Sequence, residues 1–222
     1  MALLETGEYW LVRFLLQRGL AAIYLIAFLV AAFQFRPLSG EDGLLPLGQR
    51  IERQGFRESP SLFALIPEDR AIAAAAYAGI ALSLLALFGV PSVLGTGVTV
   101  AVWGLLWALY LSFVNAGGRF YGFGWESMLL ESGFLAIFLG ANGVATPDVL
   151  VWLFRWVLFR NMFGAGLIKI RGDQCWRDLT CMDYHYETQP LPNPFSWFAH
   201  HLPDRFHRVE VFHPDDRDHA PR

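Results

Sequence analysis

The stretch that decides the fold is GLAAIYLIAFLVAAFQF, residues 19–35, which contains no charged side chain. About 20 mostly apolar residues in a helix cross the hydrocarbon core of a bilayer, because lipid cannot hydrogen-bond an open backbone. Arg13 and Arg18 precede this stretch, and Arg36 and Pro37 follow it. A signal peptide is the alternative, but the apolar run is long and no small-residue cleavage site follows it. We therefore predict a membrane-spanning helix.

Further apolar segments meet the same requirement, so residues 1–170 are predicted to form an all-α, polytopic transmembrane bundle of about five spans. The predicted spans are residues 19–35, 71–90, 92–114, 125–142 and 149–170. Residues 36–70 are charged and broken by Gly and Pro, which is typical of an extramembrane loop. Residues 171–222 are polar, aromatic and interrupted by prolines, and we expect an irregular extramembrane tail.

The composition agrees with lipid as the solvent, since 55% of the residues are hydrophobic and only 17% are charged. The net charge is −3 and the basic residues are scattered, so membrane lipids are a predicted partner and nucleic acid is not. Arg13 and Arg18 favour a cytoplasmic N-terminus. The arginines within residues 36–70 favour the cytoplasm for that loop by the same rule, so both orientations stay open.

Charged side chains fall within the last two predicted spans: Glu126, Glu131, Arg155, Arg160 and Lys169. A charge at mid-membrane costs about 2.5–3.5 kcal/mol on insertion scales, so these side chains need partners or a wet cavity. If the two spans are antiparallel, the helical rise brings Glu131 to the depth of Arg160. The same count brings Glu126 to the depth of Lys169. We predict a buried charge network built on these two pairs.

This network has two interpretations. In the first, structural ion pairs hold the bundle together. In the second, Lys169 is a catalytic base, because small residues at 164–166 lie one turn before it and apolar neighbours would desolvate its amine. A nearby Glu126 would oppose that role by favouring the ammonium form. The sequence leaves both interpretations open.

A set of longer motifs surrounds these charges. They are FYGFGWESMLLE at 120–131, LFRW at 153–156, MFGAGLIKIRGD at 162–173, CWRDLTC at 175–181, DYHYETQPLPNP at 183–194 and HHLP at 200–203. Together they resemble the lipase maturation factor family, over about residues 115–210. The resemblance implies a non-enzymatic, chaperone-like membrane protein that helps secreted lipases or similar client proteins to fold and assemble. It also implies the endoplasmic reticulum membrane in a eukaryote, or the inner membrane in a bacterium.

A weaker resemblance links Ala165-Gly-x-x-Lys169 to the membrane domain of vitamin K-dependent gamma-glutamyl carboxylase. It supports the alternative function, a membrane-embedded enzyme of that carboxylase-like superfamily with Lys169 as base. A structural or transport subunit that uses the charges as a polar seam is a third possibility. Members of the maturation factor family continue into further membrane and soluble sequence, so we expect this chain, which ends at Arg222, to be truncated relative to them.

Cys175 and Cys181 enclose five residues in the tail. The family resemblance implies a non-cytoplasmic tail, where a disulfide would close this small loop. Two reduced, packed thiols are the alternative. A zinc site with His185 and His200 fits no closed ligand pattern, so we predict no metal and no cofactor. Aromatic residues of the tail suit the headgroup level of a bilayer: Phe195, Trp197 and Phe198.

Overall fold

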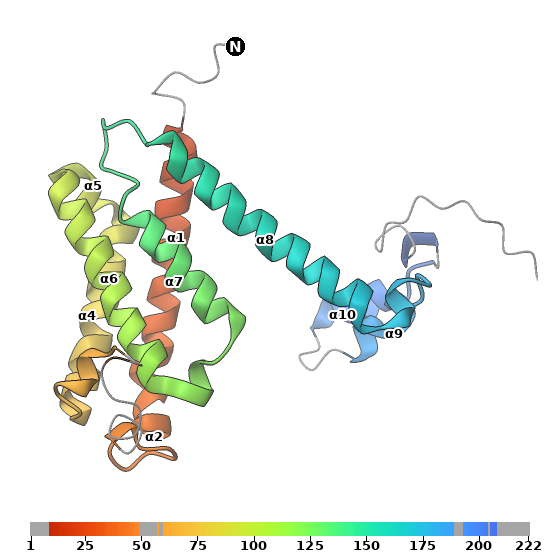
Figure 1. Cartoon of the computed structure of the whole chain (residues 1–222), viewed down its shortest axis with the longest axis horizontal. Helices are drawn as coiled ribbons and strands as arrows, with labels where there is room; N and C mark the ends of the chain where they lie inside the picture. Colours follow the sequence, from red (N-terminus) through yellow and green to blue (C-terminus); the bar gives the residue numbers. More distant parts are fainter. Residues whose placement is uncertain (1–8, 49–56, 58–59, 189–192, 204, 208–222) are drawn as a thin grey trace, which may run out of the picture. The chain divides into compact units, whose positions relative to one another are not determined.

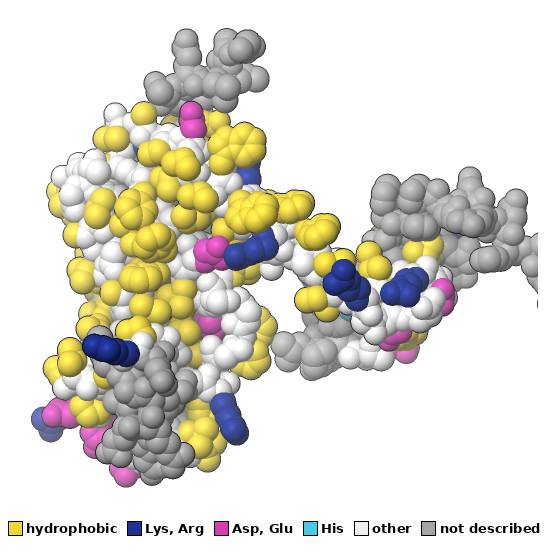
Figure 2. Space-filling view, viewed as in Figure 1, with side chains coloured by type: hydrophobic (Ala, Val, Ile, Leu, Met, Phe, Trp, Pro, Cys, Tyr) yellow, Lys and Arg dark blue, Asp and Glu magenta, His cyan; other side chains and the backbone are white. Residues whose placement is uncertain are grey.

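A computed structural model describes residues 9–48, 57, 60–188, 193–203 and 205–207, and every regular element within these ranges is helical. The predicted all-α bundle is therefore confirmed. The chain divides into two compact units, Met1–Val157 and Leu158–Arg222. In the first unit, the long helices lie side by side as a bundle (Figure 1). Hydrophobic side chains cover much of the visible face of this bundle, as lipid contact requires (Figure 2).

The first long helix begins before and ends after the predicted span of 19–35. Helix α1, Trp10–Val30, continues through a π-helical turn, η1, Ala31–Phe35, into the short helix α2, Arg36–Ser39. Pro37 has no N–H group, and its ring would clash with the carbonyl one turn earlier in a regular α-helix. The wider η1 turn directly before it accommodates the ring. The helix consequently runs on through Pro37, where the sequence predicted its end.

The next two predicted spans, 71–90 and 92–114, agree closely with the structure. Helix α4 covers Asp69–Phe88 and ends at Gly89, whose φ of 82° lies in the left-handed region that favours glycine. A short helix, α5, Val90–Leu94, forms the turn, and α6, Thr96–Gly117, follows Gly95. The two long helices therefore form the predicted hairpin, with one additional helical turn between them.

Within the described residues, three helical stretches are long and apolar enough to cross a membrane: Trp10–Ser39, Asp69–Phe88 and Thr96–Tyr121. The other two predicted spans differ. Helix α7, Gly124–Ala136, has 13 residues. At 1.5 Å per residue it is about 20 Å long, less than the hydrocarbon core. Helix α8, Asp148–Gly172, has 25 residues, but its arginines and Lys169 make it more polar than the three stretches above.

The core of the first unit is aromatic. Its largest fully or almost fully buried side chains are Tyr24, Phe28, Phe35, Phe63, Trp103, Tyr110 and Phe113. The rings of Phe35 and Phe113 meet edge to face, with centroids 4.9 Å apart. Helices α1 and α4 approach closely at Gly79, where a Cβ atom would lie 2.3 Å from the Phe28 ring. A small residue at this position is what allows the two backbones to approach.

The predicted extramembrane loop is attached to the bundle near the end of α6. The Ser61 hydroxyl donates to the backbone oxygen of Ser112 at 3.1 Å, and the Ser112 hydroxyl accepts from the N–H of Leu62 at 3.1 Å. A single 3-10 turn, η2, Leu62–Ala64, places the Phe63 ring in the aromatic core. Residues 60–64 therefore pack on the bundle.

The second unit begins within α8, whereas the domain boundary that we predict lies at residue 170. After α8 come the 3-10 turn η4, Gln174–Trp176, and the helices α9, Met182–Thr188, and α10, Pro194–His200. The Asn193 side chain caps α10 by accepting hydrogen bonds from two backbone N–H groups of its first turn, at 2.8 and 3.2 Å. The tail that we predict to be irregular thus contains regular helical segments.

Candidate functional site

Glu126 lies in the first turn of α7 and is held by aromatic donors. Its Oε2 accepts a hydrogen bond from the Tyr110 hydroxyl on α6, and its Oε1 accepts one from the Trp125 indole at 3.1 Å. Tyr110 is buried, and its ring packs edge-on against Tyr24 of α1 at 5.5 Å. The contact joins a carboxylate to the centre of the aromatic core.

Two further aromatic donors hold α7 against the bundle. The Tyr24 hydroxyl donates to the backbone oxygen of Leu129 at 3.4 Å, and the Trp107 indole donates to that of Leu130 at 3.1 Å. Sequence reasoning missed these residues because it searched for charged partners only. A signal was present, since Trp103, Trp107 and Tyr110 recur at helical spacing along α6 and carry polar tips on apolar rings.

A second polar cluster, also missed, lies at the N-terminal end of α1. Arg13 donates to the backbone oxygen of Val144, and Gln17 donates to that of Gly140 at 2.9 Å. Arg18 donates to a backbone oxygen in the last turn of α4. The acceptors of Arg13 and Gln17 both lie in the segment between α7 and α8. The contacts also show that the segment after α7 returns to the end of the bundle where α1 begins.

The other predicted network residues are divided between the two units. Glu131 lies on α7 in the first unit, whereas Arg160 and Lys169 lie beyond Val157. The Arg155 guanidinium stacks over the ring of Trp152 at 5.0 Å. The predicted pairs, Glu131 with Arg160 and Glu126 with Lys169, join residues of different units and stay predictions.

Lys169 contacts an aromatic ring within the second unit. Its Nζ lies 4.5 Å from the centroid of the Trp176 ring. This geometry is typical of a cation–π interaction, which is made by the ammonium form of lysine. The role of Lys169 as a base stays an alternative prediction, and this contact gives it no support.

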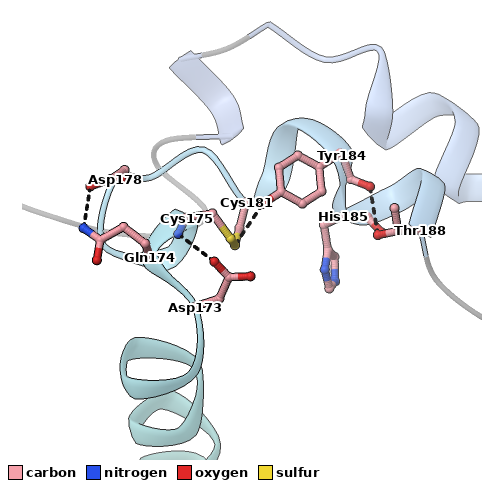
Figure 3. Close-up of a disulfide and its surroundings, with 8 residues drawn as sticks. All are labelled: Asp173, Gln174, Cys175, Asp178, Cys181, Tyr184, His185 and Thr188. Carbon is pink, nitrogen blue, oxygen red and sulfur yellow. Dashed lines mark hydrogen bonds between the residues drawn. A yellow bond between two sulfur atoms is a disulfide. The ribbon is translucent and has the colours of Figure 1, made fainter.

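Cys175 and Cys181 are joined as a disulfide, with Cα atoms 4.8 Å apart (Figure 3). The Asp173 carboxylate accepts a hydrogen bond from the N–H of Cys175 at 3.1 Å, and the N–H of Thr180 donates to the Cys175 oxygen at 3.0 Å. Cys181 is buried, and the Tyr184 hydroxyl lies 3.8 Å from its sulfur. The disulfide closes a short turn between the end of α8 and the start of α9. We propose that the protein carries this bond where it works.

Replacing Cys175 and Cys181 by serine is expected to destabilise the tail by about 2 kcal/mol, because the bond restricts the unfolded chain. Limited proteolysis should then cut residues 173–203 faster than in the unmodified protein, at an unchanged rate elsewhere. Alkylation followed by mass spectrometry tests the bond directly, and the cysteines should react only after reduction. Reaction of both thiols without reductant would contradict the pairing.

One histidine connects the two short helices of the tail, and a second packs against α10. His200 Nε2 on α10 lies 2.9 Å from Glu187 Oε1 on α9. His201 Nδ1 lies 2.7 Å from the backbone oxygen of Trp197, and the two rings are 4.4 Å apart. Among the residues that the structure describes, no group of three His, Cys, Asp or Glu side chains is arranged to hold a metal ion.

The sequence comparisons agree on one family. The model of the lipase maturation factor transmembrane domain matches residues 11–214. Lipase maturation factor 1 of Homo sapiens is 46% identical over 224 residues, which cover 94% of this chain and 40% of the human protein. Lipase maturation factor 2 of Rattus norvegicus is 37% identical over 222 residues, covering 87% of this chain and 31% of the rat protein. No solved structure matches the chain.

The match extends from the start of α1 into the tail, so it includes both units. The chain spans less than half the length of these curated relatives. Nothing in the comparisons supports the carboxylase-like alternative. The described part of the chain contains three helices that can cross a bilayer, so this is an integral membrane protein, and it belongs to the lipase maturation factor family.

Proposed function

We propose that this chain assists secreted lipases, or similar client proteins, to fold and assemble, as the membrane part of a maturation factor. The observation that carries this proposal is the family match over residues 11–214, at 46% identity to human lipase maturation factor 1. In this role the aromatic bundle anchors the protein in the membrane. The disulfide-closed tail supplies a second folded unit on the side where the client matures.

The proposed location is the endoplasmic reticulum membrane, with the tail on the lumenal side. Disulfides persist in oxidising compartments such as this lumen and are rare in the cytosol, so the Cys175–Cys181 bond fits that side. The relatives compared above come from animals, and nothing in them favours the inner membrane of a bacterium.

Rescue of lipase secretion tests the function. Because the chain corresponds to 40% of human lipase maturation factor 1, it should replace the matching segment of that protein in a chimera. The chimera is expressed with a maturation-dependent lipase in cells that lack their own factor. We expect it to restore secreted lipase activity. If the human parent restores activity and an equally expressed, membrane-located chimera does not, the proposal is wrong.

The same assay separates the enzyme alternative from the chaperone-like role. Lys169→Arg retains a cation that stacks on Trp176 but cannot act as a base, because arginine is not deprotonated in proteins. We expect this variant to rescue secretion as well as the unmodified chimera. A loss of rescue at equal expression would instead favour Lys169 as a base.

A further inference from the structure

Helix α10 turns its polar side inward and its aromatic side outward. His200 faces α9, where it meets Glu187 at 2.9 Å. The side chains of Phe195, Phe198 and Leu202 recur at a spacing of three and four residues, which places them on one side of the helical segment. They are 78%, 64% and 38% exposed. We call these three residues the outer face of α10.

This arrangement is the reverse of a helix on a water-soluble domain, which packs its apolar side against the core and leaves its polar side in water. Contiguous exposed apolar side chains indicate that another apolar medium covers them. In a protein that spans a bilayer, the lipid of that bilayer can be this medium. His200 meets Glu187 of the same unit, whereas the apolar side of α10 stays exposed.

The surroundings of α10 favour lipid as the cover. The second unit starts with the last part of α8, where outward side chains include Met162, Ile168 and Ile170. The outer face of α10 therefore belongs to the same compact unit as these other exposed apolar side chains. Next to the outer face, Trp197 stacks on His201. Aromatic rings with polar tips are enriched at the headgroup level of membranes.

We propose that the outer face of α10 lies in the lipid–water interface of the bilayer that the chain spans. The tail then rests on the membrane surface through α10, with α9 and the disulfide turn above it. This docking depends on the bilayer alone, so it holds whether or not the client is a lipase.

Spin labels attached to the full chain in nanodiscs test the docking. Single cysteines are introduced at 195, 198 or 202 and labelled with the Cys175–Cys181 disulfide intact, each label leaving the other two apolar side chains in place. A label at exposed Thr188 on α9 is the matched control. Power saturation then compares collisions with oxygen, which concentrates in lipid, and with a water-soluble nickel complex. We expect the ratio of oxygen to nickel accessibility to be several-fold higher at 195, 198 and 202 than at 188.

Two results would overturn the proposal. Equal ratios at all positions, with full access of the nickel complex, would place the outer face in water. Shielding of 195, 198 and 202 from both reagents would show that protein covers them, either a second copy or another part of the complex. Neither result bears on lipase rescue, so the docking and the proposed function fail independently.

Discussion

Gly79→Ala is expected to lower the stability of the bundle by about 2 kcal/mol. The added Cβ would lie 2.3 Å from the ring of Phe28, which is fully buried. That ring cannot withdraw easily, because it packs against Tyr110 at 5.8 Å and Phe113 at 6.0 Å. Overpacking costs about 1–3 kcal/mol, and a contact this short belongs at the upper end. The gain in helix propensity from Gly to Ala, about 1 kcal/mol, offsets only part of it.

Gly104→Ala on α6 is the control, because no atom lies within 4 Å of its added Cβ. It should leave stability unchanged or raise it slightly. The measurement is the temperature at which half of the detergent-solubilised protein remains monodisperse. Phe28→Leu should reduce the effect of Gly79→Ala, since it removes the ring that the new methyl group meets. Equal effects of Gly79→Ala and Gly104→Ala would show that α1 and α4 do not approach at this point.

Glu126→Leu is expected to destabilise the protein by about 2 kcal/mol. The substitution leaves the buried hydroxyl of Tyr110 without the carboxylate that accepts its hydrogen bond. Hydrogen bonds to charged groups contribute about 1.5–3 kcal/mol, and a buried donor left unsatisfied loses its solvation as well. Glu126→Gln retains an oxygen acceptor, so its effect should be smaller.

The pairing of Glu126 with Tyr110 is measured by a double-mutant cycle with Tyr110→Phe. In the Tyr110→Phe background, Glu126→Leu leaves no hydroxyl donor without an acceptor. The double variant should therefore be more stable than the sum of the two single effects predicts. The same thermal assay gives all four values. Strict additivity would mean that Glu126 acts through other contacts.

The hairpin of α4 and α6 could be predicted from the sequence because residues next to each helix determine where it begins and ends. Long apolar runs are bounded by Gly89 and Gly95, both with positive φ, and the predicted ends differ from the observed ones by a few residues. The start of α1 could not be found in this way. In the sequence, Arg13 resembles a charged residue that flanks a membrane span. It donates to the backbone oxygen of Val144, which lies 131 residues further along the chain.

Two further features of the structure were not predicted, for different reasons. The prediction that the fourth span reaches Asn142 overlooked Gly140, whose φ of 81° belongs to the turn that follows α7. Glycine allows that conformation, so the sequence contained a signal for an earlier end of the helix. The contact of Glu126 with the Tyr110 hydroxyl was not predicted, because the sequence analysis matched charges only with charges. Which neutral donor reaches a carboxylate depends on helix packing, and spacing along one chain does not reveal it.

The continuous helix formed by α1, η1 and α2 also indicates the thickness of the bilayer that it fits. Arg18 and Arg36 are the basic residues that bracket its uncharged stretch, and 18 residues at 1.5 Å each separate them by about 27 Å. The hydrocarbon layer of the endoplasmic reticulum is about 27 Å thick, and that of the plasma membrane is about 32–33 Å. In the thinner layer both guanidinium groups reach the headgroups with little tilt. In the thicker layer the bilayer must thin around the helix, and this mismatch would disfavour onward transport of the protein.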